Sequence, residues 1–321
     1  IKATFDYFIS KTTDMLVSVP IPASSGITSF PLTNGGNLEN KGWGLSLSYH
    51  SNSKKDFTYD VSANISSSKN KVTKLGIANE SFTDGFIEFN NFPTTRTEVG
   101  GEIGRFYLFE ADGIFKDQGE IDAHGVQPDA VPGDLRFTDV SGNGSLGDED
   151  KRYMGSGLPD FEYGLNFNAK YKNFDASMFF QGTQGNKIYN GVKMWLYRSD
   201  RNNMSSDLLN AWTPQNAGSN IPRNVFGDPN NNIRPSSYFL EDGSYIRLKN
   251  IQIGYTVPES VISKIAISNA RIYVTANNLF TSTNYSGFDP GLANGGTFTR
   301  GVDRGFYPLT KSFILGINLS F

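Results

Sequence analysis

DFEYGLNFNAKYKNFDASMFFQ, residues 160–181, contains two complete β-strands and the turn between them. From Phe161 to Tyr171 apolar residues hold the odd positions and polar or small residues hold the even ones, the period of two that separates the faces of a strand. After Lys172-Asn173 the apolar residues move to even positions, beginning with Phe174. Because residues flanking a two-residue turn share a face, this shift predicts a hairpin with one apolar and one polar face.

Each strand of this hairpin is long enough to cross a bilayer as a tilted β-strand, for which about 9 to 11 residues suffice. The same pattern recurs in six other segments, which makes eight predicted strands. In the segment from Tyr245 to Val257 the apolar phase slips, and the slip predicts a β-bulge near Lys249-Asn250. The predicted lipid-facing rows of the six segments are Ile1, Ala3, Phe5, Tyr7, Ile9; Trp43, Leu45, Leu47, Tyr49; Phe57, Tyr59, Val61, Ala63, Ile65; Ile246, Leu248, Ile251, Ile253, Tyr255, Val257; Ile272, Val274, Ala276, Phe280; and Phe313, Leu315, Ile317, Leu319, Phe321.

Composition narrows the function classes. The 321 residues include no Cys, which excludes disulfides, thiolate metal sites and Cys nucleophiles, and the net charge of −3 argues against a basic nucleic-acid surface. No apolar run reaches the roughly 18 residues of a transmembrane helix. The only histidines are His50 and His124, and no nucleophile lies at a recognisable spacing from either. We therefore expect a protein that is not an enzyme.

The connections between the predicted strands alternate between short and long. The long ones are residues 10–42, 67–159, 182–244 and 281–311. Outer-membrane barrels have short periplasmic turns and long extracellular loops, so the pattern predicts an all-β fold, a portion of an antiparallel transmembrane β-barrel with about eight strands. A soluble β-sandwich with large insertions is the alternative. The apolar row that ends in the aromatic Phe321 favours the barrel.

Several segments together resemble the SusC/RagA family of TonB-dependent outer-membrane transporters from Bacteroidota. They occur in the family's order and span nearly the whole chain. The segments are NLENKGWGLSL (37–47), ADGIF (111–115), PGDLRFTDVSGNGSLGDEDKRYMGSGLPDFEYGLNF (132–167), AWTPQN with IPR (211–216, 221–223), FLEDGSYIRLKNIQIGYTVP (239–258), ARIYVTANNLFT (270–281), YSGFDP (285–290) and YPLTKSFILGINLSF (307–321).

The resemblance implies a place in the bacterial outer membrane and a role in nutrient import. A SusD-like surface lipoprotein would cover the long loops and capture an oligosaccharide or a peptide, and TonB would drive its passage. The family barrel has 22 strands and a plug domain, so residues 1–321 would correspond to its last eight strands, without the plug. The abrupt start at Ile1, inside a strand, agrees with a missing upstream part. An independent eight-stranded barrel, a surface binding protein without transport, and a soluble calcium-stabilised β-domain stay open.

DVSGNGSLGDED, residues 139–150, has the spacing of an EF-hand calcium loop. Asp139, Ser141, Asn143 and Asp150 stand at ligand positions 1, 3, 5 and 12, and Ser145 offers a carbonyl at position 7. Only two of these residues are carboxylates, and Asp150 replaces the usual bidentate Glu, so we expect weak calcium binding. The alternative is a polar surface turn stabilised by its own side chains.

Aromatic residues in the predicted loops are the candidates for ligand binding. Trp195, Trp212 and Phe288 could stack on sugar rings or dock a partner, and Tyr189 and Tyr197 lie in the same stretch as Trp195. The alternative is that these side chains pack the loops against one another.

The polar rows of the strands predict a hydrated barrel wall. The identity of the substrate depends on loop conformations that the sequence does not provide.

Overall fold

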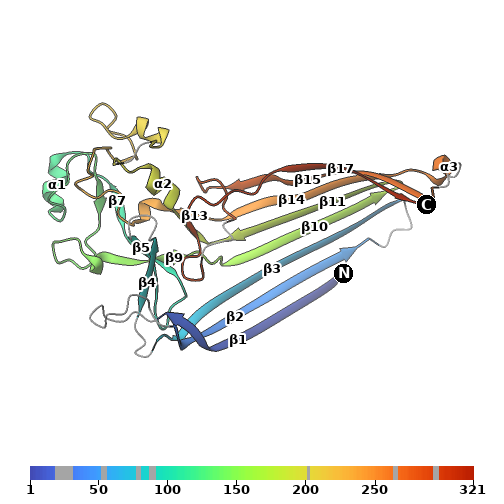
Figure 1. The fold of residues 1–321 in the computed structure, drawn as a ribbon, viewed down its shortest axis with the longest axis horizontal. Helices are drawn as coiled ribbons and strands as arrows, with labels where there is room; N and C mark the ends of the chain where they lie inside the picture. The colour runs from blue at the N-terminus through green and yellow to red at the C-terminus, as the bar shows by residue number, and fades with distance from the viewer. Residues whose placement is uncertain are drawn as a thin grey trace.

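The protein has two parts, an eight-stranded antiparallel sheet and a bundle of loops at one end of it (Figure 1). The described residues of the long connections after β3, β11 and β15 lie at this end, whereas the turn between β10 and β11, helix α3 and both chain ends lie at the other. Every sheet strand therefore runs between a loop end and a turn end. The computed structural model describes residues 1–18, 32–51, 56–76, 81–86, 92–200, 203–262, 267–291 and 296–321.

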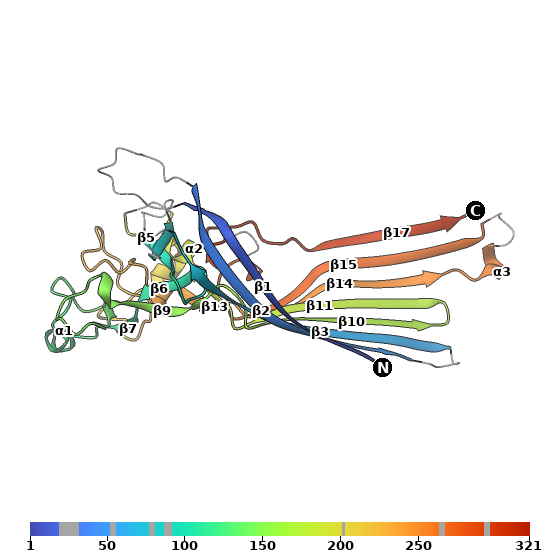
Figure 2. The ribbon, with the colours of Figure 1, turned by 90° about the horizontal axis from the view of Figure 1, so that it is seen from below.

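The strands of the large sheet follow one another in chain order, each pairing with the next. The sheet is curved, and its first and last strands lie apart (Figure 2). Among the described residues no pairing joins them, so both margins of the sheet are open. The strands are β1 (Lys2–Ser18), β2 (Leu32–His50), β3 (Phe57–Lys74), β10 (Phe161–Tyr171), β11 (Phe174–Gln184), β14 (Tyr245–Thr256), β15 (Asn269–Thr283) and β17 (Ser312–Ser320).

The central hairpin of β10 and β11 has the predicted register. Phe161 pairs with Gln184 and Tyr171 pairs with Phe174 without interruption, so Lys172-Asn173 is a two-residue turn. Lys172 has a φ of 51°, the left-handed conformation that tight turns demand. The predicted β-bulge is also confirmed, because the pairing of β14 with β15 shifts between Leu248 and Asn250.

Across the sheet, one face carries the predicted apolar rows. Register places Phe167 beside Val61 and Met178, and the same face continues through Ile253 and Val274. The other face is polar. There Arg271 Nε donates to Asp175 Oδ1 at 2.9 Å, and Gly254 leaves the space between them, since a Cβ at Gly254 would lie 2.4 Å from the guanidinium. An apolar face and a hydrogen-bonded polar face are the two sides of a transmembrane barrel wall.

The predicted loop boundaries were too wide. β1 continues to Ser18, β2 begins at Leu32 and β3 runs to Lys74, so parts of the predicted loops 10–42 and 67–159 are strand. The prediction ended each strand where its alternating apolar row ended, but the backbone pairing of these strands continues beyond that row. Residues 19–31 of the first predicted loop lie outside the described residues.

The loop bundle consists of the described residues between β3 and β10, between β11 and β14, and between β15 and β17. None of the described helices is long and apolar enough to span a membrane. The remaining strands are β4 (Phe82–Phe86), β5 (Phe92–Thr97), β6 (Arg105–Phe109), β7 (Ala111–Ile114), β8 (Leu135–Phe137), β9 (Lys151–Ser156), β12 (Lys187–Asn190), β13 (Leu240–Asp242) and β16 (Val302–Asp303); the α-helices are α1 (Gln118–His124), α2 (Gly191–Leu196) and α3 (Glu259–Ile262), and the 3-10 helices are η3 (Asp148–Asp150), η4 (Ser206–Asn210) and η5 (Ser237–Phe239).

Candidate functional site

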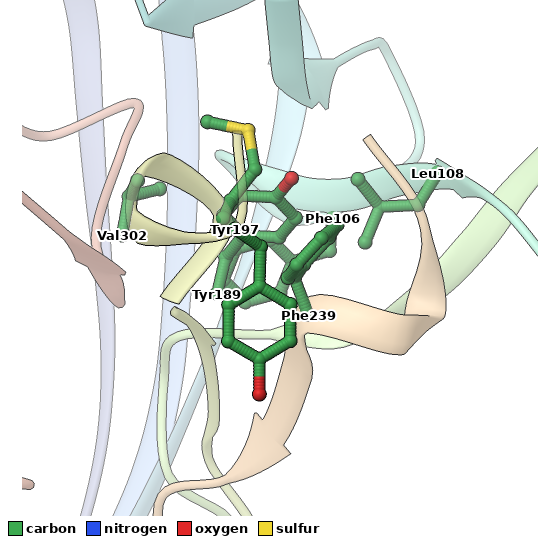
Figure 3. Close-up of a cluster of buried hydrophobic side chains, with 7 residues drawn as sticks. Phe106, Leu108, Tyr189, Tyr197, Phe239 and Val302 are labelled. Carbon is green, nitrogen blue, oxygen red and sulfur yellow. The ribbon is translucent and has the colours of Figure 1, made fainter. Parts of the chain in front are cut away.

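One hydrophobic cluster holds the loop bundle together (Figure 3). Phe106 and Leu108 come from the loop after β3, Tyr189 and Phe239 from the loop after β11, and Val302 from the loop after β15. All five side chains are fully buried. Because three loops far apart in sequence share one core, their surfaces are held as a unit.

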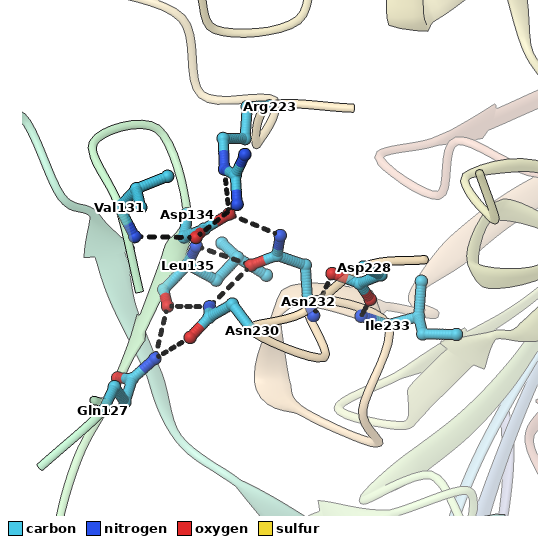
Figure 4. A network of polar contacts seen from close by, with 9 residues as sticks. All are labelled: Gln127, Val131, Asp134, Leu135, Arg223, Asp228, Asn230, Asn232 and Ile233. Carbon is cyan, nitrogen blue, oxygen red and sulfur yellow. Dashed lines mark hydrogen bonds and ion pairs between the residues drawn. The ribbon is translucent and has the colours of Figure 1, made fainter. Parts of the chain in front are cut away.

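A buried polar clasp joins two of the loop segments (Figure 4). Arg223 Nε donates to Asp134 Oδ1 at 2.6 Å and Arg223 Nη2 donates to Asp134 Oδ2 at 3.0 Å, while Asn232 Nδ2 donates to Asp134 Oδ1 at 2.9 Å. Gln127 Nε2 donates to Asn230 Oδ1 at 2.8 Å. Asp134 has no exposed surface. A buried carboxylate with this many partners fixes the two segments in one geometry.

The surface of the bundle has an aromatic cavity of about 520 Å³. Tyr197 and Tyr238 provide rings in its wall, and Phe288 is 72% exposed at its edge. Lys193 Nζ lies 4.9 Å from the centre of the Tyr238 ring. The other lining residues are Asn190, Val192, Leu196, Ser205, Asp207, Asn210, Asn220, Ile221, Ser286 and Gly287.

Both tyrosine hydroxyls of the aromatic cavity stay protonated. Burial, with the carboxylate of Asp207 nearby, raises the pKa of Tyr197 to about 12, and burial also raises the pKa of Tyr238. The Tyr197 hydroxyl donates to Asp207 Oδ2 at 3.3 Å. Aromatic faces beside amide, hydroxyl and charged groups suit a ligand that has both apolar faces and hydrogen-bonding groups.

A second cavity, of about 440 Å³, lies where the polar face of the sheet meets the loops, and we call it the lumen-mouth cavity. Glu162, Gln181 and Arg247 reach it from β10, β11 and β14, and Tyr307, which is 86% exposed, reaches it from the loop after β15. Its other lining residues are Gly157, Pro159, Thr183, Asn186, Tyr245, Lys249, Asp289, Pro290, Gly291, Arg300, Phe306 and Leu309.

An ion pair in the lumen-mouth cavity ties the last long loop to the sheet. Arg247 Nη2 donates to Asp289 Oδ1 at 2.5 Å, and the Leu309 amide donates to Asp289 Oδ2 at 2.9 Å. Burial alone would raise the pKa of Asp289, but these hydrogen bonds outweigh it and hold the pKa below its ordinary value. Asp289 is therefore ionised at neutral pH and is paired with Arg247.

The predicted calcium loop is a compact turn. Asp139 accepts hydrogen bonds from the amides of Gly142 and Gly144, at 2.6 and 2.8 Å, and Asp150 accepts from the amides of Ser141 and Gly147, at 2.9 and 2.8 Å. Burial would raise the pKa of Asp150, but these amides outweigh it and hold the pKa low.

Three further predicted ligands also bond within the turn: the Ser141 hydroxyl donates to Asp139 Oδ1 at 3.1 Å, and the Ser145 amide and hydroxyl both donate to Asn143 Oδ1 at 2.8 Å. Within the described residues no three His, Asp or Glu side chains converge as a metal site. The loop holds only two carboxylates at its ligand positions, and calcium binding stays a prediction.

The three aromatic ligand candidates lie in different surroundings. Phe288 lines the aromatic cavity. Trp212 packs against Gly133, because a Cβ at Gly133 would lie 2.3 Å from Trp212 Cε3. Trp195 lies under the guanidinium of Arg198, with 5.2 Å between the guanidinium carbon and the ring centre. The structure brings Phe288 to a cavity and gives the two tryptophans packing contacts.

Neither histidine lines the aromatic cavity or the lumen-mouth cavity. The His50 Nδ1 atom contacts the Asp60 carboxylate at the turn end of the sheet, on exposed side chains. The His124 ring packs edge-on against Phe115, with 5.3 Å between the ring centres.

The residues that shape the site are not apparent from the sequence. Asp134 and Arg223 are 89 residues apart, and Arg247 and Asp289 are 42 apart, so no local spacing connects either pair. The only available signal was that Asp134 lies in the quoted segment 132–167, Arg223 in 221–223, Arg247 in 239–258 and Asp289 in 285–290.

The chain is similar to TonB-dependent receptors over its whole length. It is 36% identical to TonB-dependent receptor P3 and 35% identical to TonB-dependent receptor P26, both from Formosa agariphila, over 100% and 99% of this chain. It is 28% identical to TonB-dependent receptor SusC from Bacteroides thetaiotaomicron over 98% of this chain. The chain spans only about a third of these relatives, 32%, 32% and 30% of their lengths. No protein-family model matches.

Solved structures show the same similarity in three dimensions. The structure of the RagAB peptide transporter superposes with a TM-score of 0.78 and 27% identity, covering 99% of this chain and 33% of the matched chain. The RagAB peptide importer in its "open-open" state superposes with a TM-score of 0.76 and 26% identity, covering 99% and 32%.

Proposed function

Because this chain belongs to the SusC/RagA family of TonB-dependent outer-membrane receptors, and not to a family of enzymes, we propose that it forms part of a nutrient importer. In this proposal the loop bundle receives an oligosaccharide or a peptide from a SusD-like lipoprotein, and TonB drives its entry. The observation that carries the proposal is the lumen-mouth cavity, which combines the polar face of three strands with an exposed loop side chain, Tyr307.

The open margins of the sheet support a place within a larger barrel. Among the described residues β1 pairs only with β2, and β17 only with β15. Unpaired backbone groups are costly in hydrocarbon, so spanning sheets close on themselves. We propose that further strands of a receptor pair with both margins, and that the plug and the segment that contacts TonB belong to that remainder.

The two cavities support uptake of an oligomeric polar substrate. The aromatic cavity offers ring faces, and the lumen-mouth cavity offers amide, hydroxyl and paired ionic groups. Such walls suit both sugars and peptides. The RagAB relative is a peptide transporter, and a peptide is one of the two substrate classes that we propose here.

The test is uptake by cells that depend on the receptor containing this chain. The cells are given a mixture of short oligosaccharides and a tryptic peptide digest, and mass spectrometry follows which compounds leave the medium. We expect Tyr307→Ala to reduce uptake while the amount of receptor in the outer membrane is unchanged. The matched control is Leu209→Ala, which changes another exposed apolar residue, 88% exposed and outside both cavities.

Deletion of TonB from the same cells gives the second arm. Loss of uptake without TonB supports energised import. If cells with and without TonB bind the mixture at their surface but neither strain takes compounds up from the medium, the receptor is a surface binding protein and not an importer. Uptake that is equal with and without TonB would reject the proposal.

A further inference from the structure

Four lysines form a band on the apolar side of the sheet, beyond its apolar row. Lys41 of β2 pairs with Ile9 of β1 and with Lys69 of β3. One step farther toward the loops, Glu39 pairs with Lys11 and with Lys71. Paired residues share a face, so Lys11, Lys41, Lys69 and Lys71 project from the same side, and we call them the basic band.

An aromatic belt lies directly below the basic band. Trp43 pairs with Tyr7 one step toward the turn end, on the same face. The Trp43 ring packs edge-on against Phe161 of β10, with 6.3 Å between ring centres. Aromatic residues concentrate where a barrel leaves the hydrocarbon, at the level of the lipid headgroups. The basic band therefore begins at the headgroup level, on the side of the sheet that faces lipid.

The opposite side of these strand ends is covered by the loop bundle. Val72 is buried and exchanges backbone hydrogen bonds with Gly100 and Gly101, each at 2.8 Å. Asn70 Oδ1 accepts from the Ile103 amide at 2.8 Å. The loops thus occupy the inner side, and the basic band faces away from them and from both cavities.

The charges in the band are not balanced. Glu39 lies 2.6 Å from Lys41 and 3.7 Å from Lys11, and Asp160 lies 3.8 Å from Lys69. Four ammonium groups beside two carboxylates leave a positive surplus in a chain whose net charge is −3. The lysine side chains stay accessible, with 70%, 53% and 70% exposure at Lys11, Lys41 and Lys69.

Lys41 and Lys69 lie side by side and are unequally neutralised, since Glu39 lies 2.6 Å from Lys41 but Asp160 lies 3.8 Å from Lys69. They are direct cross-strand partners, and like charges in that position repel and destabilise a sheet. An anionic group bound between them would relieve this repulsion. We propose that the basic band binds the phosphate groups of anionic lipids in the leaflet on the loop side of the membrane. This inference rests on the position of the sheet in the outer membrane and is independent of transport and its substrate.

The test measures binding of diphosphoryl lipid A to the receptor in neutral detergent by native mass spectrometry. The variant carries Lys11→Gln, Lys41→Gln, Lys69→Gln and Lys71→Gln. At an anionic surface each lysine changes binding about fivefold, so the loss of four should weaken it by well over tenfold. The matched control carries Lys2→Gln, Lys116→Gln, Lys170→Gln and Lys172→Gln, which removes the same charge elsewhere and should keep the affinity within about threefold of that of the unaltered receptor.

Two further arms identify the source of the phosphate. Lipid A without its phosphates should bind both variants equally weakly, and millimolar inorganic phosphate should not displace diphosphoryl lipid A. Unchanged affinity in the band variant, an equal loss in the control, or displacement by free phosphate would overturn the proposal. A circular dichroism spectrum that matches the unaltered receptor shows that each variant is folded.

Discussion

The loop bundle and the sheet bury their apolar residues in opposite ways. In the bundle Phe106, Leu108 and Tyr189 have no exposed surface, as in any globular core. In the sheet Phe313, Leu315 and Ile317 remain 71%, 72% and 62% exposed. The bundle therefore gains its stability from contacts within the chain, whereas the apolar side of the sheet is covered only when lipid surrounds it.

This difference separates the effects that substitutions should have. A change in the bundle should alter its stability in any detergent or bilayer, because its partners are its own residues. A change on the apolar side of the sheet should depend on its depth in the membrane. The polar side should tolerate changes that the apolar side does not.

The largest effect is expected for Asp134→Ala in the buried clasp. It leaves the Arg223 guanidinium and the Asn232 amide without their carboxylate, and loss of one partner of a buried pair costs about 3 to 5 kcal/mol. Guanidinium unfolding of the receptor in detergent, followed by tryptophan fluorescence, measures the loss. The matched control is Asp148→Ala at a carboxylate whose side chain is 91% exposed, where the change should be small. Equal losses would contradict the role of the clasp.

A lipid-facing charge should have the next largest effect. Phe167→Arg places a cation on the apolar side in the middle of β10, and it should cost about 2 to 4 kcal/mol if Phe167 lies near the bilayer midplane. Asn166→Arg, one residue away on the polar side, should be tolerated. Urea titration of receptor refolded into liposomes measures both. Equal tolerance at the two positions would refute the assignment of the faces.

A small steric change in the bundle should cost less. Gly133→Ala places a methyl group 2.3 Å from Trp212 Cε3, so the ring must move, and overpacking of this kind costs about 1 to 3 kcal/mol. Gly142→Ala is the control, because Gly142 also has a positive φ, 71°, but has open space around it. The tryptophan emission maximum, measured by fluorescence, should shift in Gly133→Ala and not in Gly142→Ala. A larger loss in the control would show that backbone strain, and not Trp212, sets the cost at Gly133.

Calcium should have the smallest effect. Calcium at a concentration ten times the dissociation constant of its site stabilises the folded state by about 1.4 kcal/mol. Calorimetric titration of the receptor with calcium measures the binding heat, and Asp139→Asn should abolish it. No heat above that of buffer would exclude calcium and leave residues 139–150 as a self-bonded turn.

The sequence predicted the parts of the fold that depend on a local period. The odd-to-even shift around Lys172-Asn173 and the phase slip at Lys249 are visible within a few residues, and both occur in the structure. The strand ends were predicted less well. Ser18 and Lys74 still belong to strands, although the alternation of apolar and polar residues has stopped before each of them, and an apolar row carries no information about where backbone pairing stops.

By itself, then, the sequence determined the hairpin, the two faces of the sheet and the family, because alternation and short motifs are properties of neighbouring residues. The site, in contrast, depends on contacts between residues far apart in the chain. The partnership of Asp134 with Arg223, the meeting of Arg247 with Asp289 and the cross-strand pair of Lys41 and Lys69 join residues from different segments. Such pairs form when loops share a core and strands settle into register, and no local pattern encodes that choice.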